Sequence, residues 1–221
     1  MNWLNRLNRK WGRYGIDSLM IYVTVTMLAI YLTQWILNIP IYQYLYFSRP
    51  LILSGQIWRV VTFLFLPPVS SSFLLVLISL YFFYFIGNSL EDTWGRFYFT
   101  VYYLLGAVGA IIAGFISGIG DNTYLNLSLF LAFAQLFPDF EVRVFFLFPL
   151  KVKYLAYLDW GLFALSFIFG GWSSRAAILM SMVHFFVFFG PDIWRRFQTR
   201  RKYGPARRKF RQQNRDNPFN Y

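Results

Sequence analysis

The sequence contains no cysteine and only one histidine among its 221 residues. The absence of cysteine excludes disulfides, thiolate metal sites and cysteine nucleophiles. With one histidine, only carboxylates remain as metal ligands, and the Asp and Glu residues are not clustered in the sequence. Glycine-rich phosphate loops and dinucleotide-binding motifs are missing as well. We therefore expect neither a metal nor another cofactor.

Charged residues are also scarce, at 14% of the chain, whereas 57% of the residues are hydrophobic and 23% are aromatic. A soluble domain of this size has too small an interior to hide so much apolar surface. A membrane-spanning helix needs about 20 mostly apolar residues, and runs near that length recur along the chain. We predict an all-α membrane protein with six spans, at residues 19–37, 72–90, 97–119, 124–137, 154–170 and 176–194.

Two of these runs have special features. The first lacks a small-residue cleavage site, so we expect a span there and no cleaved signal peptide. The fourth is short for a full crossing, so it should be tilted, buried inside the bundle, or begin below the membrane surface.

The distribution of basic residues supports an even number of spans. If the N-terminus is cytoplasmic, the outer segments contain only three of the 21 Lys and Arg residues, namely Arg49, Arg59 and Arg175. This asymmetry follows the positive-inside rule and places both termini in the cytoplasm. The net charge of +12 is therefore mainly a sign of topology.

The C-terminal segment differs in composition from the rest of the chain. We predict one membrane domain over residues 1–196 and a basic, disordered cytoplasmic tail over residues 197–221. The tail should contact anionic lipids, and we expect no nucleic-acid partner. The compact core without an endoplasmic-reticulum retrieval signal favours a bacterial plasma membrane, with the endoplasmic reticulum membrane as the alternative.

The segment between the first two predicted spans, residues 38–71, contains GQIWRVVTFLFLPPVSSS. It is too apolar for a solvated loop and too interrupted for a span, so it should lie along the outer leaflet or dip into it. Trp58 suits the interface, with an apolar ring and one N–H. Arg59 is costly at depth unless it snorkels or its five N–H donors satisfy loop carbonyls.

Small residues mark the second and third predicted spans. The second ends in GNSLEDTWG, which contains Gly87, Glu91 and Gly95. The third places small residues three or four positions apart, which lets neighbouring backbones approach closely in lipid. These residues are Gly106, Gly109, Ala110, Ala113 and Gly114.

This combination resembles the rhomboid superfamily. That family has a Trp-Arg pair in a membrane-dipping first loop and an E-x-x-x-G motif at the end of the second span, here Trp58–Arg59 and Glu91–Gly95. The stretch QIWRVVTFLF also resembles the derlins, the non-proteolytic branch of the superfamily. The likeness covers residues 50–191 and implies a six-helix rhomboid-like bundle.

The resemblance also implies where a serine protease of this family would keep its catalytic groups. Leu75 and Ser79 stand where the family has a histidine and an asparagine on the second span. The fourth span lacks the G-x-S-G motif, and Asn126 and Ser128 are the residues nearest the nucleophile position. His184 occupies the place of the catalytic base, followed by bulky phenylalanines. We therefore predict no catalytic residues, with Ser128 and His184 as the pair if the chain is active.

Several polar residues within the predicted spans remain to be explained. Ser128 is expected to donate its hydroxyl proton to its own helix, and His184 to link helices as a neutral imidazole. Asp159 is an intramembrane carboxyl and hence a functional candidate; it could form a polar cluster with Asn126 and His184, or lie shallowly and bind Lys153 or a tyrosine. The segment around Pro149 predicts a short hairpin at the cytoplasmic headgroups.

The function implied by the resemblance is that of a pseudoprotease in membrane protein quality control. Such a protein binds transmembrane or membrane-exiting clients and perturbs the bilayer locally, with a protease or an AAA-type ATPase as a further partner. Two alternatives stay open. One is an active intramembrane protease using Ser128 and His184, and the other is a small transporter or channel built around Asp159.

Overall fold

A computed structural model describes residues 2–70, 72–144, 148–172, 174–175, 178–180, 182–183 and 185–189. The chain divides into two units, residues 1–184 and 185–221. In the second unit, residues 185–189 are helical, and the rings of Phe185 and Phe189 stack with their centroids 4.8 Å apart. The tail predicted over residues 197–221 lies outside the described residues.

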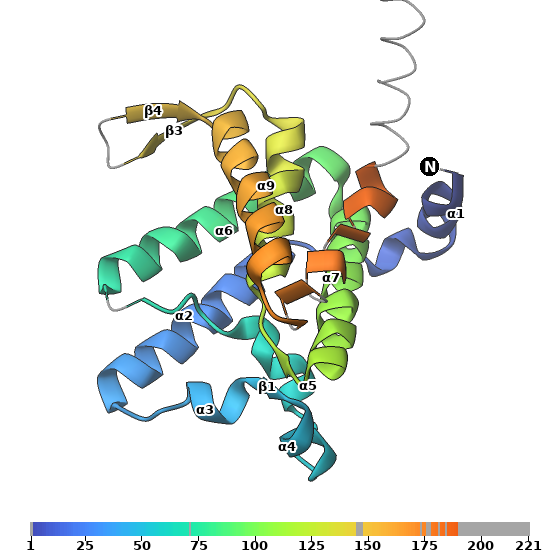
Figure 1. The fold of residues 1–221 in the computed structure, drawn as a ribbon. Coiled ribbons are helices and arrows are strands. Elements are labelled where there is room, and N and C mark those ends of the chain that lie inside the picture. Colours follow the sequence, from blue (N-terminus) through green and yellow to red (C-terminus); the bar gives the residue numbers. More distant parts are fainter. Residues whose placement is uncertain are drawn as a thin grey trace, which may run out of the picture. The chain divides into compact units, whose positions relative to one another are not determined.

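The first unit is mainly helical, with two small two-stranded sheets (Figure 1). Its elements are α1 (Asn2–Trp11), the 3-10 turn η1 (Gly12–Tyr14), α2 (Leu19–Leu37), α3 (Tyr42–Leu45), β1 (Phe47–Ser48), α4 (Arg49–Leu53), α5 (Arg59–Thr62), the 3-10 turn η2 (Phe63–Phe65), α6 (Phe73–Trp94), α7 (Arg96–Ser117), β2 (Ile119–Gly120), α8 (Thr123–Leu136), β3 (Glu141–Val144), β4 (Phe148–Lys151) and α9 (Val152–Phe169).

Four helices in the described part of the chain are long and apolar enough to cross a membrane: α2, α6, α7 and α9. They confirm helices at four of the predicted spans, with bounds that differ by a few residues at most. In the range of the sixth predicted span, the described residues 178–180, 182–183 and 185–189 are helical. The remaining residues of that range, including His184, lie outside the described residues.

Helix α8, the fourth predicted span, is shorter than these four. Its 14 residues rise about 21 Å, less than the roughly 30 Å of a bilayer's hydrocarbon core. It packs against α6, α7 and α9, and most of its side chains are buried. The expectation that this span is buried inside the bundle is therefore confirmed.

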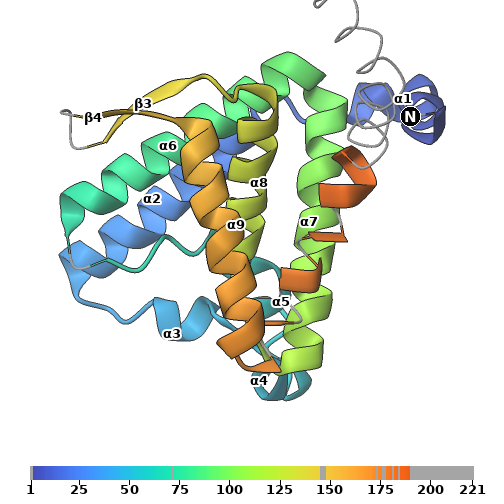
Figure 2. The ribbon, with the colours of Figure 1, turned by 45° about the horizontal axis from the view of Figure 1, so that its top comes forward.

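Helices α2 and α6 lie side by side and splay away from α9 (Figure 2). Gly87 on α6 allows this close packing, because a Cβ atom added there would overlap the side chain of Met20 on α2. Met20 is itself buried. A glycine is thus required at this contact between the two helices.

The small-residue face of α7 is buried, as expected, and includes Gly106, Gly109 and Ala113. At Gly114, however, it receives the ring of Phe47 from the first loop and not a neighbouring helix. Strand β1 pairs antiparallel with β2 at the end of α7, and this pairing brings the fully buried Phe47 onto Gly114. The first loop is therefore anchored to the third long helix.

The hairpin predicted around Pro149 is confirmed. Strands β3 and β4 pair antiparallel with Glu141 opposite Lys151, and α9 begins directly afterwards. Asp139, just before the hairpin, accepts a hydrogen bond from Lys153 at 3.1 Å and lies 3.6 Å from Lys151 Nζ. That hydrogen bond, with the charges of the two lysines, holds the pKa of Asp139 below its ordinary value.

The Phe47 anchor yields a test of stability in a matched pair of variants. A Cβ at Gly114 would lie 2.7 Å from the Phe47 ring, which is wedged edge-on against Phe63 and Phe115. A Cβ at Gly109 would meet Met180 at an ordinary 3.5 Å. Both Gly→Ala changes gain the same helix propensity. The difference between the unfolding free energies of the two variants therefore measures the cost of the overlap between the new Cβ and the Phe47 ring.

We expect Gly114→Ala to be less stable than Gly109→Ala by about 1–3 kcal/mol in the free energy of unfolding, measured by reversible denaturation in detergent micelles. Equal stabilities of the two variants would contradict the assigned packing of Phe47.

Candidate functional site

Arg59, on the one-turn helix α5, is a buried cation whose donors are well satisfied. Only 3% of its surface is exposed. Its Nη1 donates to the backbone carbonyls of Gln43 at 3.0 Å and Tyr46 at 2.9 Å, and its Nε donates to Oε1 of Gln56 at 2.7 Å. The guanidinium also lies 4.9 Å from the centroid of the Tyr46 ring. The expectation that Arg59 satisfies loop carbonyls is confirmed.

Two neighbours of Arg59 complete the same network. Trp58 Nε1 donates to the carbonyl of Tyr44 at 3.2 Å, and the Thr62 hydroxyl donates to the carbonyl of Leu45 at 3.0 Å. Four consecutive carbonyls at the C-terminal end of α3 therefore receive side-chain donors from one turn of α5. The last carbonyls of a helix have no intrahelical partner, and a cation is favourable there. The Trp58 ring remains exposed at the surface of the loop, as expected for an interfacial residue.

The two residues of the E-x-x-x-G motif stabilise two helix ends: Glu91 binds the start of α2, and Gly95 forms the turn between α6 and α7. Glu91 Oε1 accepts a hydrogen bond of 2.7 Å from the backbone N–H of Ser18, which precedes α2 with a positive φ of 55°. Gly95 separates α6 from α7 with a φ of 85°, a conformation that favours glycine. Its N–H donates to the Glu91 carbonyl at 2.7 Å. Both motif residues thus have structural roles in the described part of the chain.

Ser128 is buried within α8, and its hydroxyl donates to the carbonyl of Leu125 at 2.7 Å. The bond to its own helix was expected, although it reaches back three residues and not four. The Tyr102 hydroxyl donates to the Ser128 carbonyl at 3.1 Å. His184, the other member of the candidate pair, lies outside the described residues.

At the positions of the family's oxyanion residues, α6 carries Leu75 and Ser79. The Ser79 hydroxyl donates to the Leu75 carbonyl at 2.8 Å. Both of these residues therefore belong to an ordinary apolar helix with a hydroxyl bonded back onto its own backbone.

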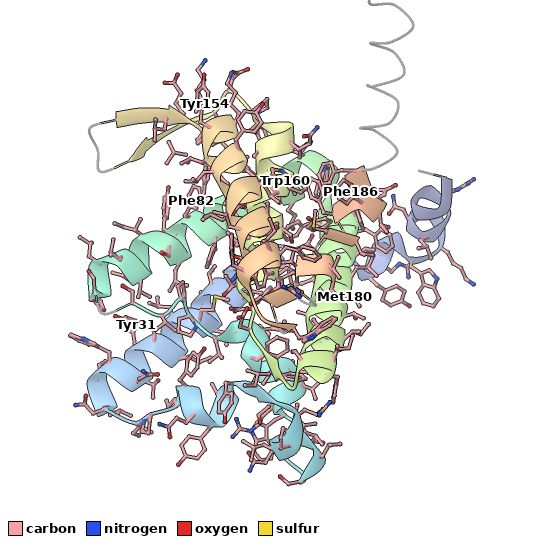
Figure 3. The ribbon with its side chains drawn as sticks, in the orientation of Figure 1. Tyr31, Phe82, Tyr154, Trp160, Met180 and Phe186 are labelled. Carbon is pink, nitrogen blue, oxygen red and sulfur yellow. The ribbon has the colours of Figure 1, made fainter. Side chains whose placement is uncertain are left out.

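A cavity of about 380 Å³ lies between α6, α8 and α9. Helices α6 and α9 each pack against α8, and in the described residues they do not pack extensively against one another. Apolar side chains make up most of the lining, and the label on Phe82 in Figure 3 marks its α6 border. Leu158 and Leu162 form the α9 border and are themselves exposed. The cavity therefore opens sideways, between α6 and α9.

Two polar residues predicted as intramembrane candidates, Asn126 and Asp159, line this same cavity. Asp159 is only 5% exposed, and its Oδ2 has no hydrogen-bond partner in the described part of the chain. The structure thus brings these two candidates to one site, and His184, the third member of the predicted cluster, lies outside the described residues.

Lys153, one of the partners predicted for Asp159 in a shallow position, instead binds Asp139 at the base of the hairpin. Asp159 is seven positions after Val152, where α9 begins, and so lies about 10 Å farther along the helix.

Asn122 is a residue of this region that the sequence analysis missed. Its side-chain Nδ2 donates to the carbonyls of Leu64 at 3.0 Å and Leu66 at 2.9 Å, and so ties the first loop to the start of α8. Its position directly before an apolar run is typical of a helix N-cap, and that was the available signal.

Comparison with protein families supports the resemblance. The family model described as the Rhomboid domain matches residues 54–129, which include the Trp-Arg pair, the E-x-x-x-G motif and the first half of α8. No curated protein matches the chain.

The network around Arg59 predicts the effect of a conservative change. Arg59→Lys should lower the free energy of unfolding by about 2–3 kcal/mol, because one ammonium cannot reproduce the fork that serves Gln43, Tyr46 and Gln56. Denaturation in detergent would measure the loss. The matched control is Arg49→Lys, since exposed Arg49 donates from its side chain to one carbonyl, that of Phe115, at 3.1 Å. A loss for Arg59→Lys no larger than that for Arg49→Lys would contradict this role.

Proposed function

This chain belongs to the rhomboid superfamily of multi-pass membrane proteins, and we propose that it is a catalytically inactive member that binds transmembrane or membrane-exiting client proteins. In this proposal, client segments reach the protein from within the bilayer. The setting is membrane protein quality control, where a partner protease or AAA-type ATPase acts on the captured client. A bacterial plasma membrane is the favoured location.

The observation that carries the proposal is the sideways opening between α6 and α9. Neither helix closes against the other, and α8 forms the back wall of the cavity between them. In lipid, a helix is held by close packing and by polar contacts, since apolar burial alone favours no particular partner. An unfilled apolar recess with Asn126 and Asp159 in its wall offers both kinds of contact to a passing helix.

Local perturbation of the bilayer has support from two features. Helix α8 is too short to cross a membrane of ordinary thickness. The first loop also presents several large apolar side chains that the protein does not cover, namely Leu53, Ile57, Trp58 and Val61. A short central helix beside an apolar loop favours a thinned bilayer at this face, which lowers the cost of moving a client out of the membrane.

The absence of catalysis is supported by the surroundings of Ser128. A serine nucleophile needs room for a substrate carbonyl to approach its hydroxyl. The Ser128 hydroxyl is buried and donates to Leu125, and its sequence neighbours Leu127 and Leu129 leave no glycine for close approach of a substrate backbone. These features favour binding over proteolysis by Ser128 and His184.

The transporter alternative has less support. A pathway for polar solutes needs a polar lining through the bilayer, whereas most residues around this cavity are Leu, Phe, Ile or Pro. The same lining suits the side chains of a transmembrane helix.

A site-specific photo-crosslinking experiment tests the proposal. Leu158 and Tyr157 are neighbours on α9 with 61% and 69% of their surfaces exposed, but of the two only Leu158 lines the cavity. Adjacent residues point about 100° apart on a helix. A photoreactive residue at position 158 should crosslink a single-span client in liposomes several times more strongly than one at position 157.

Equal crosslinking from both positions would mean that the client contacts α9 without using the cavity. If neither position gave crosslinks, client binding at this face would be refuted.

A further inference from the structure

The carboxyl of Asp159 is the one ionisable group among the described residues that line the cavity. It is more than nine-tenths buried, and its Oδ2 lacks a hydrogen-bond partner. Leaving such a group unpaired in a membrane protein is costly, and intramembrane carboxyls normally face a partner, a pathway or a ligand. The described part of the bundle supplies no such partner, because Lys153 is engaged by Asp139.

The residues around this carboxyl suit the binding of one long side chain. Phe82 and Phe83 on α6 and Leu155 and Leu162 on α9 are apolar, so they suit a stem of methylene groups. The volume of about 380 Å³ exceeds the space of one side chain but not that of a helix. Lys and Arg combine an apolar stem with a cationic head that bonds strongly to a carboxylate.

The depth of Asp159 distinguishes between possible sources of such a cation. It lies about two turns into α9, counted from the β3–β4 hairpin. Amine headgroups of lipids reside at the interface, whereas a basic residue in the middle of a transmembrane segment is carried to this depth by its own helix. A Lys or Arg in the middle of a span is also energetically costly in lipid, so a buried carboxylate partner stabilises it more than it would stabilise a residue at the interface.

We propose that Asp159 selects client helices that carry a Lys or Arg near the middle of their span, with the side chain entering the cavity and its cationic head meeting the Asp159 carboxyl beside Asn126. This inference rests on the proposed client binding and names the client class. Apolar contacts along α6 and α9 would hold a helix of any sequence weakly, and Asp159 would add selectivity for the basic ones.

The test uses the full-length protein in liposomes with synthetic transmembrane peptides that carry an acceptor dye. Because the chain has no cysteine, a single cysteine introduced at Val69, which is 86% exposed and follows the cavity residue Pro68, provides one donor-dye position. Three peptides share a leucine core: one without a basic residue, one with a central Lys, and one with that Lys moved to the end turn. Energy transfer reports the affinity of each.

We expect the central-Lys peptide to bind the wild-type protein at least ~10-fold more tightly than the leucine peptide, a selectivity in the range of a buried charged contact. In Asp159→Asn, which keeps the shape of the side chain, this preference should fall to less than about 2-fold, while binding of the leucine peptide stays unchanged. Unchanged leucine-peptide binding shows that the variant is folded. Asp139→Asn, which removes a carboxylate outside the cavity, should retain the full preference.

Three results would overturn the inference. Persistence of the Lys preference in Asp159→Asn would exclude Asp159 as its source. An equal gain from a Lys in the end turn would point to headgroup-level attraction. Equal binding of the central-Lys and leucine peptides to the wild-type protein would remove the selectivity but leave client binding intact. Failure of every peptide to bind would refute the proposed function itself, so the two failures are distinguishable.

Discussion

Polar groups inside a bilayer must find their partners within the protein, because the surrounding lipid offers none. In the first loop, Trp58, Arg59 and Thr62, at and just before α5, supply donors to four successive carbonyls at the end of α3. Those donors satisfy backbone groups that apolar surroundings would otherwise leave unpaired. The loop in turn places Phe47 against Gly114 and receives the Asn122 side chain at Leu64 and Leu66, and so it braces α7 and α8.

The same requirement is unmet at one place in the cavity. Asp159 Oδ2 is buried without a partner, next to an opening that exists because α6 and α9 both pack on the short helix α8. Arg59 and Asp159 are both buried ionisable residues, but Arg59 makes three hydrogen bonds within the protein, whereas Asp159 Oδ2 has no partner among the described residues. Asp159, unlike Arg59, also lines a cavity, where a ligand could reach it.

The architecture could be predicted from the sequence to a large extent. Apolar runs located α2, α6, α7, α8 and α9, the short fourth run indicated its burial, and the residues around Pro149 indicated the hairpin. The structural role of Arg59 was also predictable, because a guanidinium in an apolar loop has few alternatives to backbone carbonyls.

The tertiary partners could not be predicted in this way. A stripe of small residues indicates that something approaches closely, but it does not say that the neighbour of Gly114 is a loop phenylalanine. Similarly, the sequence marked Asp159 and Asn126 as unusual without showing that they line one cavity or that Lys153 is occupied by Asp139. Such facts depend on how helices distant in the chain are placed, and hydrophobic periodicity carries no information about that placement.

A protein that holds a transmembrane client without cutting it leaves the client at its full mass, and mass spectrometry of a recovered client measures this. A single-span client would be incubated with the purified protein in liposomes, co-purified with it, and weighed by mass spectrometry. We expect the client to be recovered bound and at full length, with wild type and Ser128→Ala giving identical spectra. Client fragments that the wild-type protein produces and Ser128→Ala does not would refute the proposed pseudoprotease and identify an active protease.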